Sequence, residues 1–103
     1  MIGDAPVIDF HGHVGNWETA AMRDEPSRML HAMDGAGVDR ACVFNIFHPE
    51  GRRANDSTAA FVARHPDRFI GFAYVSPTMP ETLEPELTRA IDELGLRAIK
   101  IYP

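Results

Sequence analysis

Two histidines separated by a single residue, His11 and His13, stand at the end of the first apolar run of the chain. Neutral imidazole is a common ligand of zinc and of other divalent cations. Side chains alternate between the two faces of a strand, so Asp9, His11 and His13 are expected on one face, with Phe10 and Gly12 on the other. This spacing predicts that both imidazoles can reach one metal ion. Asp9 is expected either to accept a hydrogen bond that fixes the tautomer of a ring or simply to lie next to the metal site.

A His-x-His pair by itself is a weak signal, because short motifs also arise by chance. The pair gains weight from its place at the carboxyl end of a predicted first strand, which is where parallel α/β proteins form their sites. A catalytic zinc site uses three protein ligands and an open position. Further ligands must therefore come from elsewhere. The expected cofactor is a divalent metal, zinc first, with manganese and iron as alternatives.

Lys100 is the next candidate, on the last apolar run. If Lys100 and Tyr102 face inward, the Lys100 amine either is carboxylated and bridges metal ions or pairs with a substrate; otherwise it extends to solvent. Three more residues could contact a substrate: Asn45 and His48 near the end of the second apolar run, and Trp17 after the first. Each could instead be a solvated loop residue or a packing residue. No residue is assigned a catalytic role.

Four short apolar runs, rich in β-branched and aromatic residues, predict the strands that position these side chains: residues 7–11, 41–46, 69–75 and 98–102. Alternation of strands with helices predicts a parallel sheet with right-handed crossovers. Either an open doubly wound sheet or part of a (β/α)8 barrel fits. A whole barrel needs about 250 residues, so residues 1–103 are expected to form the N-terminal half of one, a truncated domain of four strands and three helices.

The segments between the strands have helix signals. The first helix has its start signal at residues 24–27, with a capping candidate and Pro26 in the first turn, and Gly37 offers a left-handed stop. In the second, Asn55 or Asp56 can cap the start. The third is expected to begin near residue 82 or 84, because Pro85 is tolerated only in a first turn. Its apolar face is formed by Leu83, Leu87, Ala90, Ile91 and Leu94.

Charge and composition exclude several classes of function. The net charge is -5 and no Lys/Arg cluster is present, which argues against binding to a nucleic acid backbone. No apolar run approaches the length of a membrane span, and the N-terminus lacks the pattern of a targeting signal. The single cysteine, Cys42, cannot form an internal disulfide and is expected to be a buried thiol. A cytoplasmic protein is expected.

Several segments, taken together and in order, resemble a known family: residues 7–13 (VIDFHGH), Asn55-Asp56, residues 65–77 (HPDRFIGFAYVSP) and residues 93–103 (ELGLRAIKIYP). They are similar to the amidohydrolase-related metal-dependent hydrolases, which include aminocarboxymuconate-semialdehyde decarboxylase. The resemblance implies a (β/α)8 barrel and a mononuclear divalent metal, usually zinc. It also implies hydrolysis or decarboxylation of a small carboxylated or cyclic substrate. His11 and His13 match the first two metal ligands of the family, and the remaining ligands would lie beyond Pro103.

The expected function is therefore that of the N-terminal part of a metal-dependent enzyme, either a hydrolase of a small cyclic amide, ester or lactone or a non-oxidative decarboxylase. The isolated chain is expected to show no turnover and to bind metal weakly. The alternative is a non-catalytic half-barrel that self-associates or only binds metal, because two copies could cover each other's open strand edges. We expect a homo-oligomer, or a C-terminal half that covers those edges. A flavodoxin-like sheet that binds phosphate is disfavoured, because no glycine-rich turn of the required form follows the first strand.

Overall fold

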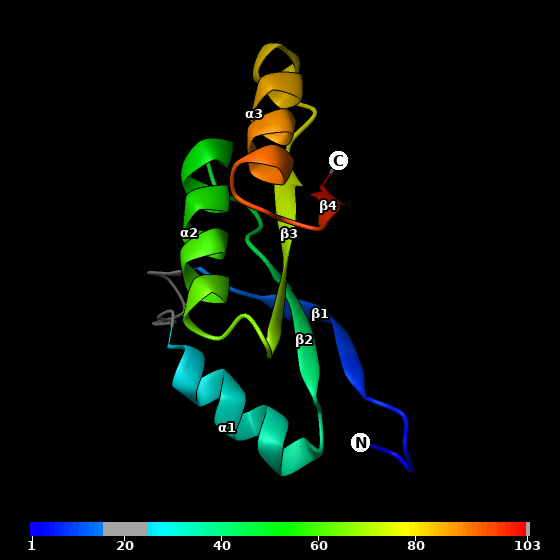
Figure 1. Cartoon of the computed structure of the whole chain (residues 1–103). Helices are drawn as coiled ribbons and strands as arrows, with labels where there is room; N and C mark the ends of the chain where they lie inside the picture. The colour runs from blue at the N-terminus through cyan, green and yellow to red at the C-terminus, as the bar shows by residue number, and fades with distance from the viewer. Residues whose placement is uncertain (16–24, 103) are drawn as a thin grey trace.

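The computed structural model describes residues 1–15 and 25–102, drawn in Figure 1. Strands and helices alternate along the chain, as the sequence predicts. The elements in order are β1 (Ile8–His13), α1 (Pro26–Ala36), β2 (Arg40–Phe44), α2 (Gly51–Arg64), β3 (Phe69–Val75), α3 (Pro80–Asp92) and β4 (Ala98–Ile101).

The four strands form one parallel sheet in the order β1-β2-β3-β4. A doubly wound sheet places later strands on both sides of the first strand and helices on both faces. Here each strand is added beside the previous one, and α1 and α2 lie on the same side of β2 and β3 (Figure 1). Continued winding of this kind closes a barrel. The architecture is therefore the predicted half of a (β/α)8 barrel with parallel strands.

The helices bury one face of the sheet. Side chains of β2 and β3 pack there against α1 and α2 in a cluster that contains Ala41, Val43, Phe69, Met33 and Phe61. The ring centres of Phe61 and Phe69 are 4.8 Å apart. Burial of this apolar area is the main term that stabilises the unit, at about 25 cal/mol per Å².

The opposite face of the sheet, called the inner face below, is lined by Cys42, Phe44, Ile46 and Phe72, all of them buried. The rings of Phe44 and Phe72 stack with their centres 6.0 Å apart. Cys42 has the buried thiol that the sequence predicts. In a (β/α)8 barrel this face becomes the interior, and its carboxyl-terminal end carries the site.

Helix boundaries agree with the sequence in α1 and differ in the other two. Pro26 is the first residue of α1, and Gly37 ends that helix with a left-handed φ of 72°. The α2 helix begins at Gly51, so Asn55 and Asp56 lie inside the helix and do not cap it. The α3 helix begins at Pro80, and Pro85 lies within it. Among the described residues no helix is both long and apolar enough to span a membrane.

Candidate metal centre

Strand β1 carries one extra residue relative to β2. Asp9 pairs with Ala41, but the next pairs are Gly12 with Val43 and His13 with Phe44. Phe10 and His11 therefore face a single residue of β2, which is the arrangement of a β-bulge. Bulges break strict alternation, and the expectation that Phe10 lies on the face opposite to the histidines is wrong.

The ring of Phe10 packs edge-on against Phe72, with centres 5.4 Å apart, and Phe72 belongs to the inner face. Phe10 therefore shares the inner face with His11 and His13, whose rings both contact Phe44. Asp9 pairs with Ala41 ahead of the extra residue, and its side chain is exposed. The bulge therefore lies between Asp9 and the two histidines, so simple alternation does not place these three side chains on one face.

Gly12 permits this local geometry. A Cβ atom at position 12 would lie 2.9 Å from the carbonyl oxygen of Cys42 and 3.3 Å from a Val43 methyl group. Backbone oxygen cannot move aside as a flexible side chain can, so only glycine allows β1 to approach β2 this closely. A glycine inside a predicted strand is itself a signal of a bulge or of close backbone approach.

The two imidazoles converge. The Nε2 atoms of His11 and His13 are 3.0 Å apart, and the ring centres are 4.9 Å apart. Two nitrogens that each lie about 2.1 Å from one ion, at an angle of roughly 90° to 110°, are separated by about 3.0–3.4 Å. The donor set therefore fits joint ligation of one divalent cation by these two rings.

Asp9 acts on the backbone of the bulge. Its Oδ1 accepts a hydrogen bond from the backbone N–H of His11 at 3.0 Å. This local side-chain to backbone bond is typical of aspartate in turns and irregular backbone. Asp9 therefore holds the peptide that carries the first imidazole in place.

The electrostatic surroundings favour neutral imidazole. The pKa of His13 is lowered by partial burial, by the neighbouring His11 ring and by the positive charge of Lys100. Only the unprotonated ring can bind a metal through Nε2, so this shift keeps His13 available as a ligand towards lower pH.

Lys100 reaches the same place from the other edge of the sheet. Its Nζ lies 5.0 Å from the centre of the Phe44 ring and 5.8 Å from that of Tyr102. Such cation–π contacts are worth about 0.5–2 kcal/mol. The Phe44 ring is thus contacted by residues of both outer strands. The two imidazoles of β1 lie against it edge-on, and the Lys100 ammonium of β4 lies over its face.

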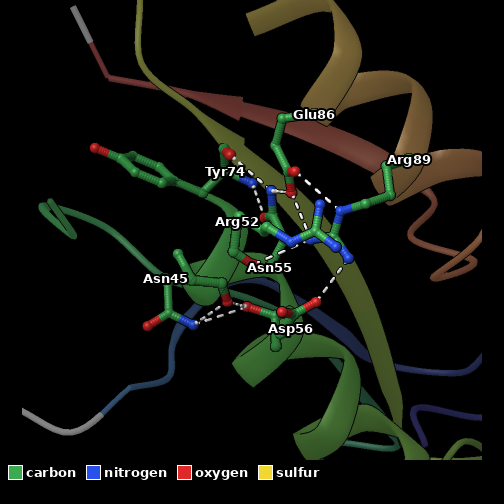
Figure 2. Close-up of polar contacts among 9 residues, drawn as sticks. Asn45, Arg52, Asn55, Asp56, Tyr74, Glu86 and Arg89 are labelled. Carbon is green, nitrogen blue, oxygen red and sulfur yellow. Dashed lines mark hydrogen bonds and ion pairs between the residues drawn. The ribbon is translucent and has the colours of Figure 1, made fainter. Parts of the chain in front are cut away.

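The remaining sequence candidates lie elsewhere. The Asn45 amide, 3% exposed, donates to the Ala54 carbonyl at 2.9 Å and to Thr58 Oγ1 at 2.8 Å, so it faces α2 (Figure 2). Asn45, which could contact a substrate by its place in the sequence, therefore ties the end of β2 to the helix and does not face the histidine pair. Trp17 lies outside the described residues.

His48 lies in the loop between β2 and α2. Its Nδ1 accepts the backbone N–H of Glu50 at 3.0 Å. The imidazole lines a cavity of about 240 Å³ between this loop and the start of α3. The structure thus places His48 beside a cavity and not with the histidine pair.

Within residues 1–15 and 25–102, no group of three His, Cys, Asp or Glu side chains is arranged to hold a metal. The pair of imidazoles is therefore a candidate for two ligands of a metal ion and does not form a complete site among these residues. Sequence reasoning missed Phe44 as their common contact. It treated Asn55 as a helix cap, although that residue is fully buried inside α2.

Comparison with known proteins gives the following relatives. The model of the family described as "Amidohydrolase" matches residues 8–103. The chain is 50% identical over 67 residues to gamma-resorcylate decarboxylase from Polaromonas sp., a match that covers 65% of this chain and 21% of that protein. The chain thus spans about a fifth of the length of this curated relative.

Two solved structures share the fold. 2,6-Dihydroxybenzoate decarboxylase from Rhizobium superposes with a TM-score of 0.74 at 22% identity, over 91% of this chain and 37% of that one. 5-Carboxyvanillate decarboxylase from Novosphingobium aromaticivorans, crystallised with bound manganese, superposes with a TM-score of 0.79 at 21% identity, over 95% of this chain and 42% of that one. These likenesses establish the architecture of half a barrel.

Proposed function

The chain belongs to the amidohydrolase family, and we propose that it supplies the first two metal ligands of a decarboxylase that acts on a small aromatic carboxylate. His11 and His13 hold the metal in this proposal. The main observation behind this proposal is that their Nε2 atoms lie 3.0 Å apart, next to the Phe44 ring that Lys100 also contacts. The similarity to gamma-resorcylate decarboxylase supports decarboxylation as the reaction class.

A divalent metal held by His11 and His13 would supply Lewis acidity, which would stabilise negative charge that develops on the substrate. Zinc is the metal that the sequence favours, and manganese is the metal of the 5-carboxyvanillate decarboxylase crystal. Both imidazoles are neutral side chains without formal charge when they act as ligands. The net positive charge of the centre then comes from the ion and from Lys100.

The substrate class follows from the residues around the pair. The Lys100 ammonium over the Phe44 ring provides an anion-binding group next to an aromatic surface. Phe10, 72% exposed, extends that surface along β1. An ionised benzoate matches both features, because its carboxylate can pair with the ammonium while its ring stacks on phenylalanine. In this arrangement the chain's own residues bind and orient the substrate.

Hydrolysis of a cyclic amide, ester or lactone is the competing reaction within the same family. We favour decarboxylation because a carboxylate substrate uses the Lys100 ammonium, whereas a neutral lactone or amide leaves that charge without a role. Lys100 is proposed to work as a free ammonium and not as a carboxylated bridge between metals. The position of Nζ, 5.0 Å from the centre of the Phe44 ring and 5.8 Å from that of Tyr102, suits an ammonium beside aromatic rings.

The experiment uses protein from the native gene, loaded with Mn²⁺ or Zn²⁺. Release of CO2 from 2,6-dihydroxybenzoate and hydrolysis of simple lactones are measured side by side. Metal-dependent CO2 release that His11→Ala abolishes supports the proposal. Lactone hydrolysis without CO2 release would contradict decarboxylation and favour the hydrolase reaction. We expect residues 1–103 alone to bind metal weakly and to show no turnover, because two protein ligands leave most of the coordination sphere to water.

Self-association of half-barrels is the second candidate. It is favoured by apolar side chains exposed on the two outer strands of the sheet: Phe10 on β1 and, on β4, Ile99 and Ile101, which are 46% and 58% exposed. Open edges of parallel strands and exposed apolar faces favour pairing with another chain. Sedimentation velocity of residues 1–103 tests this role: a dimer supports it, and a strict monomer would remove it.

A further inference from the structure

Strands β2 and β3 separate before β3 ends. Their pairing stops at Val43 with Gly71, whereas β3 continues to pair with β4 as far as Val75 with Ile101. The last residues of β3 therefore lose β2 as a neighbour while they keep β4. A backbone N–H and C=O that lose their strand partner need another one when they are buried.

Asn55 is that partner. Its Oδ1 accepts the backbone N–H of Tyr74 at 2.7 Å, and its Nδ2 donates to the Tyr74 carbonyl at 3.0 Å (Figure 2). This two-point contact is what a neighbouring strand offers to a residue in a ladder. Asn55 is 0% exposed and comes from α2, so a side-chain amide takes the place that β2 leaves.

The amide is itself fixed from α3. Nδ2 of Asn55 also donates to Glu86 Oε1 at 3.0 Å. Arg89 binds the two oxygens of Glu86 through Nε and Nη2, at 3.0 and 2.8 Å, and reaches Asp56 Oδ1 through Nη1 at 2.8 Å. Glu86 and Arg89 are each only 12% exposed. Because every polar group has a partner, the network holds one orientation of the amide (Figure 2).

Tyr74 is paired in turn with Lys100, its partner in the β3–β4 ladder. We propose that Asn55 is a positioning residue for the metal centre: by anchoring the Tyr74 peptide it sets, through that ladder, where Lys100 stands over Phe44. This inference rests on the proposed function, because that function gives Lys100 its role of binding the substrate carboxylate. The structural part of the inference is that Asn55 positions Tyr74 and that Tyr74 positions Lys100. It can be tested without metal or substrate.

Lys100 is the only lysine of the chain and Tyr74 is one of two tyrosines. ¹⁵N-lysine labelling of the 103-residue chain therefore gives one backbone amide signal, and ¹⁵N-tyrosine labelling gives two. Asn55→Asp removes the Nδ2 donor and sets a carboxylate against Glu86. The proposal predicts that repulsion from Glu86 moves this carboxylate off the Tyr74 N–H, which it would otherwise still accept. The Tyr74 amide should then exchange with solvent about tenfold faster in this variant, and the Lys100 signal should shift.

Asn45→Asp is the matched control. It makes the same chemical change in a buried amide whose partners, Ala54 and Thr58, both lie on α2. It should destabilise the chain and leave the Tyr74 and Lys100 signals where they are in the wild type. Exchange of the Ala41 amide, which bonds the Arg68 carbonyl, reports global opening in both variants.

Glu86→Gln is the milder second variant in case Asn55→Asp does not fold. It removes the charge that holds Arg89 and keeps an acceptor for Asn55, so the Lys100 signal should shift in the same direction by a smaller amount. A Lys100 signal that is unmoved, or that Asn45→Asp moves equally, would overturn the proposal. Loss of the positioning role of Asn55 would leave the proposed function unchanged. Conversely, a protein that does not bind metal would refute the proposed function, and the measured effect of Asn55 on Lys100 would still stand.

Discussion

The ammonium of Lys100, on β4, lies 5.0 Å from the centre of the Phe44 ring, on β2, whose edge His11 and His13 meet from β1. One aromatic side chain thus links the first and the last strand of the sheet at the inner face. In the proposed function, this arrangement of an ammonium and two imidazoles around one phenylalanine binds a metal ion and an aromatic carboxylate.

Lys100→Met keeps a long apolar side chain and removes the charge. In protein from the native gene, loaded with Mn²⁺, we expect the affinity for 2,6-dihydroxybenzoate to fall about tenfold, the loss of one charge-assisted contact. Affinity for Mn²⁺ should stay within about twofold, because Lys100 is not a ligand in this account. Isothermal titration of each species gives both numbers. Equal benzoate affinity in Lys100→Met and wild type would exclude Lys100 as the carboxylate group.

Gly12→Ala should weaken metal binding and stability together. The added Cβ would lie 2.9 Å from the Cys42 carbonyl oxygen, so β1 must shift away from β2 and carry the imidazoles with it. We expect a loss of about 1–3 kcal/mol in the free energy of unfolding, as for other overpacked sites. Gly35→Ala is the control, since that glycine lies in α1 with nothing within 4 Å. It should stabilise the chain slightly; the same loss at both glycines would contradict the role of the bulge.

Arg89→Ala should be strongly destabilising, by about 3 kcal/mol, because it leaves the Glu86 carboxylate without its main partner in a nearly buried place. The Glu86 carboxylate holds the pKa of the Arg89 guanidinium above its usual range, so the arginine is charged at every working pH. Arg53→Ala serves as comparison: its ion pair with Glu50 is mostly exposed and should contribute less than about 0.5 kcal/mol. Urea unfolding of the two variants measures both values, and similar losses would argue against the network.

Stability should fall in acid through Asp39. Its Oδ2 accepts the Val7 N–H at 2.7 Å and meets the Met1 ammonium at 2.9 Å, and these contacts lower the pKa of the carboxyl group. A lowered folded-state pKa means that the contribution is present above the usual carboxyl pKa and is lost as the pH falls through the lowered one. Unfolding midpoints between pH 7 and about 3 should drop less in Asp39→Asn than in the wild type. A curve for Asp39→Asn that runs parallel to the wild-type curve would refute this role.

The sequence predicts the repeat of strands and helices because apolar periodicity and turn residues are local signals. The first helix, from Pro26 to Gly37, shows this at both ends. Asn55 shows where prediction from local signals fails. Its side chain is typical of a helix cap, but it lies inside α2 because it bonds the Tyr74 backbone, a tertiary contact that local sequence does not reveal. In the same way the bulge of β1 depends on how two strands pack, although Gly12 was a readable signal of it.

Equilibrium binding of Mn²⁺ or Zn²⁺ to residues 1–103 tests the central claim, joint ligation by His11 and His13, most directly. His11→Ala and His13→Ala are compared with His31→Ala, which changes an exposed histidine of α1. The account predicts one ion per chain in the wild type and in His31→Ala, with affinity at least about tenfold weaker in either of the other two variants. Affinity that is the same in all four proteins would contradict it.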